Sequence, residues 1–333
     1  MTTTVERPQP LGAPPPAPPV PATGKPAPDT RYLALRNFAI SISIFNIFGY
    51  TLLGFEQPWL WPILAVLVGY TTEIVFELIS SWARKRAPRF TGRGARGMYE
   101  FLLPSHITAL ACNMLLYAND MFLPIAFAVI VGVTGKHVLQ APIYGRMRHY
   151  MNPSNFGITV SLVVFGSWIS IAPPYEFTEN VNTFWRMMIP IIIVTAGTVI
   201  NAMLTKRVAL IVGWLGGFAI QAFLRFAIWD VAIFNALGVM TGVAFVLFTN
   251  YMITDPGTTP SKPRNQFMFG ASVAMVYGVL MLFNVVYTLF FAVVVVCGLR
   301  GLGWWVAHLR KRAREAPAPA AAPSSLRTAE TVA

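Results

Sequence analysis

The run from Leu60 to Trp82, LWPILAVLVGYTTEIVFELISSW, decides the class of this protein. An α-helix rises about 1.5 Å per residue, so about 20 such residues cross the ~30 Å hydrocarbon core of a bilayer. Only two charged residues interrupt this run, and the rest of it is predominantly apolar. The stretch therefore predicts a membrane-spanning helix over residues 60–82.

Comparable apolar runs recur along the chain. The mean hydropathy is +0.58, and only 11% of the 333 residues are charged, against about 25% in soluble globular proteins. This composition excludes a soluble single domain and predicts an all-α polytopic membrane protein. The ten expected helices cover residues 36–54, 60–82, 100–117, 123–138, 155–172, 185–204, 208–228, 231–252, 267–284 and 286–308.

The loops between these helices alternate in charge. Basic residues follow the second, fourth, sixth, eighth and tenth helices, whereas the opposite loops carry Glu56, Asp120, Glu176, Glu179 and Asp230. Cytoplasmic loops of membrane proteins are enriched in Lys and Arg. We therefore expect a multi-pass protein of the cell (inner or plasma) membrane with both termini in the cytoplasm. The net charge of +12 belongs to these loops, so no nucleic-acid partner is expected.

The two ends differ in composition from the apolar region. Residues 1–30 contain ten prolines, and the C-terminal segment is rich in Ala, Pro and Ser. Such sequences favour disorder because they cannot bury enough apolar surface. We expect a disordered Pro-rich cytoplasmic tail over residues 1–30, a ten-helix transmembrane domain over 31–312, and a second disordered tail over 313–333.

Ten helices divide into two sets of five, and an odd number per set makes the second set inverted relative to the first. The third helix runs into Asn119 and Asp120, and the eighth runs into Asn250 and Asp255. Inverted repeats of this kind place a binding site near the membrane midplane, where interrupted helices meet. The sequence predicts two inverted five-helix repeats, with chance similarity as the alternative.

Ionisable side chains within the apolar runs are the next candidates for function. Glu73 and Glu77 are four residues apart and share one helix face. Intramembrane carboxylates are costly and usually functional, but these two also lie close enough to the following basic loop to pair with it. Cys112 and Cys297 lie inside apolar runs without metal-ligand spacing, so no metal site is expected.

Two loops concentrate hydrogen-bonding groups beyond what helix connection requires. The first joins Gly135-Lys136-His137 to Asn152-Pro153-Ser154-Asn155, where a helix N-terminus offers free backbone N–H groups to an anion. The second reads Ile253-Thr254-Asp255-Pro256-Gly257-Thr258-Thr259-Pro260-Ser261-Lys262. We expect the second loop to fold back toward the bundle and meet the first. The candidate binding residues are Lys136, His137, Asn152, Pro153, Ser154, Asn155, Thr254, Asp255, Thr258 and Thr259.

At these two loops the chain resembles the RnfD/NqrB superfamily, the membrane subunits of ion-pumping, flavin-dependent redox complexes. The family pattern is Gly-Lys-(His/Glu) before an Asn-Pro-(Ala/Ser) helix start, then Ala-Thr-Asp-Pro-Val-Thr-Ser-Pro before the ninth helix. Here the matching residues are 135–137, 152–154 and 253–260. The likeness covers about residues 36–308 and is greatest to the UnbU-type RnfD-like proteins of enediyne biosynthesis.

The resemblance implies a membrane electron-transfer subunit that binds a flavin or quinone-like group and serves enediyne natural-product biosynthesis. Family members with covalent FMN carry a Ser-Gly-Ala-Thr attachment sequence, which does not occur here. A flavin, as FMN or riboflavin, is therefore expected to be noncovalent. Expected partners are the lipid bilayer and other redox subunits or biosynthetic enzymes. At most, the chain would be one subunit of a membrane redox complex, with no catalytic residue assigned.

A different class of function fits the same features. Inverted repeats and broken helices also build channels and transporters, here for a small polar solute or a pathway product. A structural anchor for soluble enzymes is a third reading.

Overall fold

The computed structural model describes residues 30–315. The two tails expected to be disordered therefore lie almost wholly outside the described residues. The helical region is slightly longer than the expected 31–312, because the first helix begins at Thr30 and the last ends at Glu315.

The first half of the chain supplies five helices of 13 to 23 residues. They are α1 (Thr30–Phe48, extended by a π-helical turn, Gly49–Leu53), α2 (Trp61–Ala83), α3 (Gly94–Leu115), α4 (Phe122–Val138) and α5 (Pro153–Phe165). A 3-10 helix, Pro174–Phe177, follows before the second half begins.

The second half contains interrupted helices. Its elements are α6 (Thr183–Val199, then a π-helical turn, Ile200–Thr205), α7 (Val208–Trp229), α8 (Ile233–Gly238), a 3-10 turn (Val239–Thr241), α9 (Val243–Leu247, then a π-helical turn, Phe248–Met252), α10 (Pro263–Leu282) and α11 (Thr288–Glu315). Expected helix 231–252 is thus broken, and its two parts, Ile233–Thr241 and Val243–Met252, meet at 65°.

Strands are few and short within the described residues. β1 (Leu116–Tyr117) pairs antiparallel with β4 (Ser170–Ile171), and β2 (Gln140–Ile143) forms a hairpin with β3 (Arg146–His149). The architecture is therefore all-α, as the sequence predicts, with two small strand pairs at helix ends.

Six described helices are long and apolar enough to cross a membrane, and the bent pair makes a possible seventh. The chain is thus an all-α membrane protein, but ten spans are not supported by length and composition alone. Helices α4 and α5 are too short for that criterion, with 17 and 13 residues, and α3 falls outside the qualifying set. Many residues of these three helices are buried. A helix covered by protein needs less lipid-facing apolar surface than an exposed one.

Helices α4 and α5 pack with their backbones unusually close. A Cβ atom at Gly157 would lie 2.1 Å from the carbonyl oxygen of Ala128, and one at Gly132 would lie 2.5 Å from the carbonyl oxygen of Pro153. Glycine is required at both contacts because any side chain would separate the helices. This contact fixes the start of α5 against α4.

Aromatic packing holds the broken span in the second half. Trp214 of α7 is fully buried, and its indole N–H donates to the Thr249 hydroxyl at 2.9 Å. Its ring contacts those of Phe218, Phe245 and Tyr277. These contacts attach α9 and its π-helical turn to α7 and α10.

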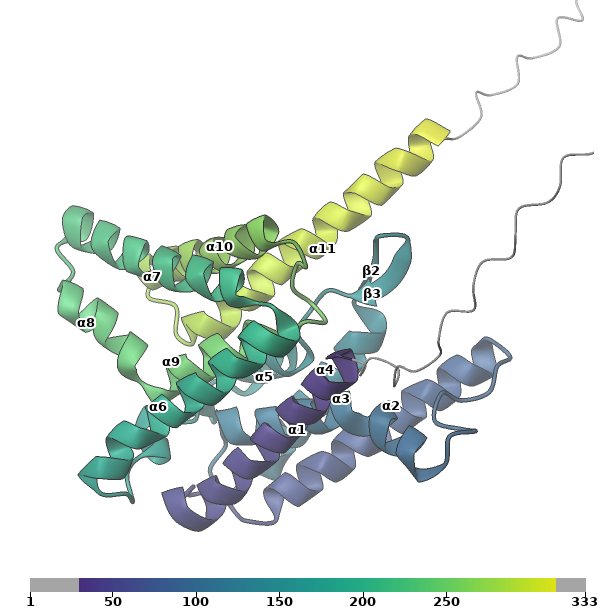
Figure 1. Cartoon of the computed structure of the whole chain (residues 1–333), viewed down its shortest axis with the longest axis horizontal. Coiled ribbons are helices and arrows are strands. Elements are labelled where there is room, and N and C mark those ends of the chain that lie inside the picture. The colour runs from purple at the N-terminus through teal and green to yellow at the C-terminus, as the bar shows by residue number, and fades with distance from the viewer. Residues whose placement is uncertain (1–29, 316–333) are drawn as a thin grey trace, which may run out of the picture.

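Figure 1 shows α11 extending well beyond the other helices, with the β2–β3 hairpin beside it. The Trp305 indole N–H donates to the carbonyl oxygen of Gln140 at 2.9 Å, and the rings of Tyr144 and Trp304 lie 5.2 Å apart. The hairpin thus braces the projecting helix.

Candidate functional site

The start of α5 is a capped helix N-terminus. The Asn152 side-chain oxygen accepts hydrogen bonds from the backbone N–H of Asn155 at 3.0 Å and from the Ser154 hydroxyl at 2.9 Å. Pro153 occupies the first helical turn, where its missing N–H costs nothing. The cap therefore uses groups that the sequence assigned to a ligand.

The loop after the eighth expected helix is also internally bonded. Asp255 accepts hydrogen bonds from the Gly257 backbone N–H at 3.0 Å and the Thr258 hydroxyl at 2.9 Å. The hydroxyls of Thr254 and Thr259 donate to the carbonyl oxygens of Asn250 and Asp255. The Asp255 carboxylate thus accepts hydrogen bonds from its own loop.

The two loops are brought together, as expected. The Asn152 amide donates to the carbonyl oxygen of Met252 at 3.0 Å, and the Asn155 amide donates to that of Phe290 at 2.9 Å. Thr254, Thr258 and Thr259 are buried, so the loop is not an open connector. These hydrogen bonds join the start of α5 to the π-helical turn that follows α9 and to α11.

Lys136 and His137 have a different neighbour. The Lys136 ammonium lies 2.6 Å from a carboxylate oxygen of Glu73, and His137 Nε2 lies 3.5 Å from the same oxygen. His137 also stacks on Phe76 at a centroid distance of 5.0 Å. Lys136 thus forms a buried ion pair with Glu73 of α2.

Glu77 pairs with the basic loop that follows α2, as the sequence allowed. Its carboxylate lies 2.6 Å from Arg86 and 2.7 Å from Arg89. For Glu73 that interpretation was wrong, because its partner Lys136 is 63 residues away on α4.

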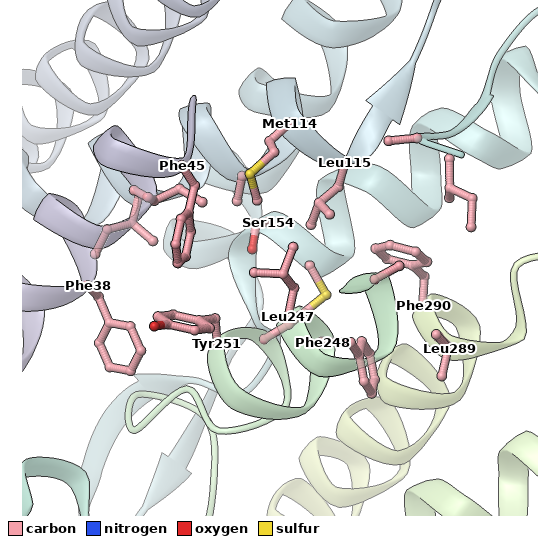
Figure 2. Close-up of a pocket in the computed structure, with 17 residues that line it drawn as sticks. Phe38, Phe45, Met114, Leu115, Ser154, Leu247, Phe248, Tyr251, Leu289 and Phe290 are labelled. Atoms are coloured by element: carbon pink, nitrogen blue, oxygen red, sulfur yellow. The ribbon is translucent and has the colours of Figure 1, made fainter. Parts of the chain in front are cut away.

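A cavity of about 70 Å³ lies between the two halves of the chain. Figure 2 shows aromatic and aliphatic side chains directed toward it from both halves. The labelled lining residues are Phe38 and Phe45 of α1, Met114 and Leu115 of α3, Ser154 of α5, Leu247 of α9, Phe248 and Tyr251 of the π-helical turn, and Leu289 and Phe290 of α11.

The cavity adjoins the contact between the two motif loops. Ser154 and Met252 both line it. Met252 accepts the hydrogen bond from Asn152, and Ser154 lies two residues after Asn152. The Tyr251 hydroxyl is buried, and the side chain of Ser41 forms a hydrogen bond with it. A tyrosine hydroxyl both donates and accepts hydrogen bonds, so this one can also donate to a group in the cavity.

The sequence analysis did not single out Tyr251 or the aromatic lining. Their signal is a run of aromatic residues, Phe245, Phe248 and Tyr251, at helical spacing just before the second loop. Such a run is typical of ordinary core packing, so only the fold distinguishes its cavity-facing members.

A second cluster of polar groups, also unassigned from the sequence, surrounds Glu176 in the short 3-10 helix. Burial raises the pKa of Glu176 to about 7, and the charge of Glu56 acts in the same direction. Glu176 is only 2% exposed, and a hydrogen bond from the Glu56 backbone N–H acts on its pKa in the opposite direction, lowering it.

Together these features define a helical membrane protein with an apolar, aromatic-lined cavity between two halves joined by polar loops. No protein-family model matches the chain, and no curated protein has a significantly similar sequence.

Proposed function

We propose that this chain is an RnfD/NqrB-like membrane electron-transfer subunit that binds a flavin or quinone-like redox group between its two halves. The observation that carries the proposal is the aromatic-lined cavity beside the joined loops. Planar conjugated rings pack well against aromatic side chains. Ligand pockets are mostly apolar, with a few polar groups that orient the ligand.

The proposal includes ten membrane helices arranged as two inverted repeats, in the plasma membrane with cytoplasmic termini. Two features support the repeat. The first helix of each half, α1 or α6, ends in a π-helical turn. Each also carries an Asn, Asn46 or Asn201, whose amide donates to its own helix four residues back. These amides also donate to the carbonyl oxygens of Leu110 and Asn250, respectively.

The lining fits an uncharged ring better than a charged group. It is mainly aromatic and aliphatic, and its side-chain hydroxyls come from Ser154 and Tyr251. The Tyr251 hydroxyl would donate to a ring carbonyl, which flavins and quinones both carry. When bound, such a group would supply the capacity to accept and release electrons.

The chain's own residues would bind and orient this group. Phe45, Phe248 and Phe290 border the cavity and would exclude water from it. Asn152 and Asn155 would hold the two halves at a fixed spacing through their hydrogen bonds. The resemblance to UnbU-type proteins adds the proposal that the redox step serves enediyne biosynthesis beside other redox subunits or enzymes.

Two cavity variants test this proposal in the full-length protein. Tyr251→Phe removes only the hydroxyl and should weaken retention of the group by about threefold to tenfold, since a neutral hydrogen bond contributes ~0.5–1.5 kcal/mol. Ala111→Leu adds bulk to the lining and should reduce retention further. The measurement is the amount of flavin or quinone extracted per chain after purification.

Two matched controls make the same kinds of substitution at exposed positions outside the cavity. Tyr175→Phe changes an exposed tyrosine, and Ala227→Leu adds the same bulk to an exposed face of α7. Both should retain the group at the wild-type level. Equal retention in the cavity variants and the controls would place any bound group elsewhere and contradict the proposal.

A transporter or channel for a small polar solute or pathway product is the second candidate function. The observation that favours it is the 65° break between Ile233–Thr241 and Val243–Met252, since discontinuous helices commonly form transport sites. Solute uptake by proteoliposomes containing a colourless, quinone-free preparation would favour this candidate over the redox proposal.

A further inference from the structure

One face of α11 carries an evenly spaced row of exposed apolar side chains. Each member is between 38% and 63% exposed. Successive members are alternately four and three residues apart, which is the spacing of the a and d positions in a coiled coil. This apolar row consists of Val295, Leu299, Leu302, Val306 and Leu309.

The opposite face of the same helix is covered by the chain itself. Gly301 lies so close to Tyr150 that an added Cβ atom would be 2.4 Å from the tyrosine ring. The Trp304 ring contacts that of Tyr144 in the β2–β3 hairpin, which lies along the projecting helix (Figure 1). The apolar row therefore faces away from the rest of the chain.

Contact with lipid alone does not account for this pattern. A lipid-facing surface needs apolar side chains but no particular spacing, whereas a seven-residue repeat keeps a narrow stripe turned toward a partner helix. The row also continues along the part of α11 that extends beyond the other helices (Figure 1). Beside it lie Gly303, Ala307 and Arg310, which add little exposed apolar surface. The spacing thus indicates a second helix as the partner.

A second copy of this chain supplies a helix with the required direction. Copies inserted in one membrane share one orientation, so two α11 helices related by a two-fold axis along the membrane normal run parallel. In parallel coiled coils, a β-branched residue at a with leucine at d favours two strands. Val306 occupies an a position, between Leu302 and Leu309 at d positions.

The residues that flank the apolar row also suit a parallel pair. In such a pair, a g residue of one helix lies near the e residue five positions later in the other. Here Trp305 and Arg310 are such a pair and both are exposed, so each guanidinium could lie over the partner's indole ring, which attracts cations. One heptad earlier, Gly298 and Gly303 occupy g and e and allow close approach. A Cβ atom at Gly303 would have no neighbour within 4 Å in the described part of the chain.

We propose that α11 pairs in parallel with α11 of a second copy through the apolar row, so that the protein forms a two-fold symmetric dimer in the membrane. The interface is separate from the proposed redox cavity and does not depend on that function. No member of the apolar row lines the cavity.

Disulfide cross-linking of full-length protein in proteoliposomes provides the first test. Leu302→Cys places a thiol in the apolar row, where the two-fold axis brings both copies together, so mild oxidation should yield covalent dimers from most chains. Ala307→Cys is the matched control, because Ala307 is exposed but lies off the row, and it should give few. The native Cys112 and Cys297 are buried. Absent linkage at Leu302→Cys would mean that lipid or a different protein covers the row, and equal linkage at both positions would mean random collision. Either result would overturn the proposal.

A charge in the apolar row provides the second test. Energy transfer between two fluorescently labelled populations is followed as lipid dilutes the protein. Leu309→Lys should weaken the dimer by at least about tenfold, because each copy loses a packed leucine and meets a like charge. Ala307→Lys adds the same charge two residues away, off the row, and should dimerise like the wild type. A wild-type protein that is monomeric at every dilution, or undiminished association of Leu309→Lys, would overturn the proposal.

Discussion

Asn152 links the two halves of the molecule through a single side chain. Its oxygen caps α5, and its amide reaches the carbonyl oxygen of Met252. A capping side chain typically contributes ~1 kcal/mol. A buried carbonyl that loses its donor costs a further ~1–3 kcal/mol. Asn152 is therefore expected to matter more than an ordinary cap.

We predict that Asn152→Ala destabilises the protein by about 2–4 kcal/mol and loosens retention of any group in the cavity. Asn182→Ala is the matched control, because Asn182 caps the exposed start of α6 through Trp185 alone. It should cost only ~1 kcal/mol. Thermal unfolding in nanodiscs measures both variants, and equal losses would show that the bond to Met252 contributes nothing.

Lys136 was a candidate ligand residue, but in the structure it pairs with another side chain of the protein. Its ammonium group pairs with Glu73, and both side chains are largely buried. Removing one member of a buried pair leaves an uncompensated charge and costs ~3–5 kcal/mol, whereas replacing both can be neutral.

Lys136→Met should therefore destabilise the protein strongly, and Lys136→Met combined with Glu73→Gln should recover most of the loss. Lys311→Met is the control, because Lys311 pairs with Glu315 at an exposed position and should change stability by less than ~1 kcal/mol. Should the double variant regain stability but not the redox group, Lys136 would have a binding role after all.

At the scale of elements, the α4–α5 contact positions the capped turn. Gly157 lies so close to Ala128 that an added Cβ atom must push the helices apart. We predict that Gly157→Ala lowers the unfolding midpoint and weakens cavity retention together. Gly216→Ala, on an exposed face of α7 with nothing within 4 Å of the new atom, should leave both unchanged. Tolerance of alanine at Gly157 would contradict this close contact.

Helix positions could largely be predicted from the sequence, because long apolar runs have few alternatives in a membrane. The break in residues 231–252 could not. The run stays apolar through Gly242, where the backbone turns extended with φ −75° and ψ 142°. Only the packing of Phe245 and Phe248 against Trp214 shows why the second part departs from the first.

The site was predictable where neighbours in sequence build it and where two polar loops on the same side of the membrane meet. The Asp255 loop satisfies itself within four residues, so its geometry follows from local chemistry. The Lys136–Glu73 pair joins residues 63 positions apart, and the cavity needs α1, α3, α9 and α11 together. These two long-range contacts leave no trace in spacing or composition.

At the scale of the whole molecule, alternating loop charge predicts the orientation. Cys112 and Cys297 are buried, so the native protein should not react with a membrane-impermeant maleimide. In intact cells, Glu179→Cys should be labelled at once, whereas Ser261→Cys should be labelled only after permeabilisation. Both positions are exposed in the structure. The reverse pattern would reject the expected orientation.

The proposal of a redox group between the two halves is tested most directly by the purified wild-type protein itself. Its absorbance spectrum is recorded before and after chemical reduction, and the bound group is then extracted and identified. The account predicts about one flavin or quinone per chain, released by denaturation because no covalent attachment sequence is present. A colourless protein whose extract contains neither group would contradict it.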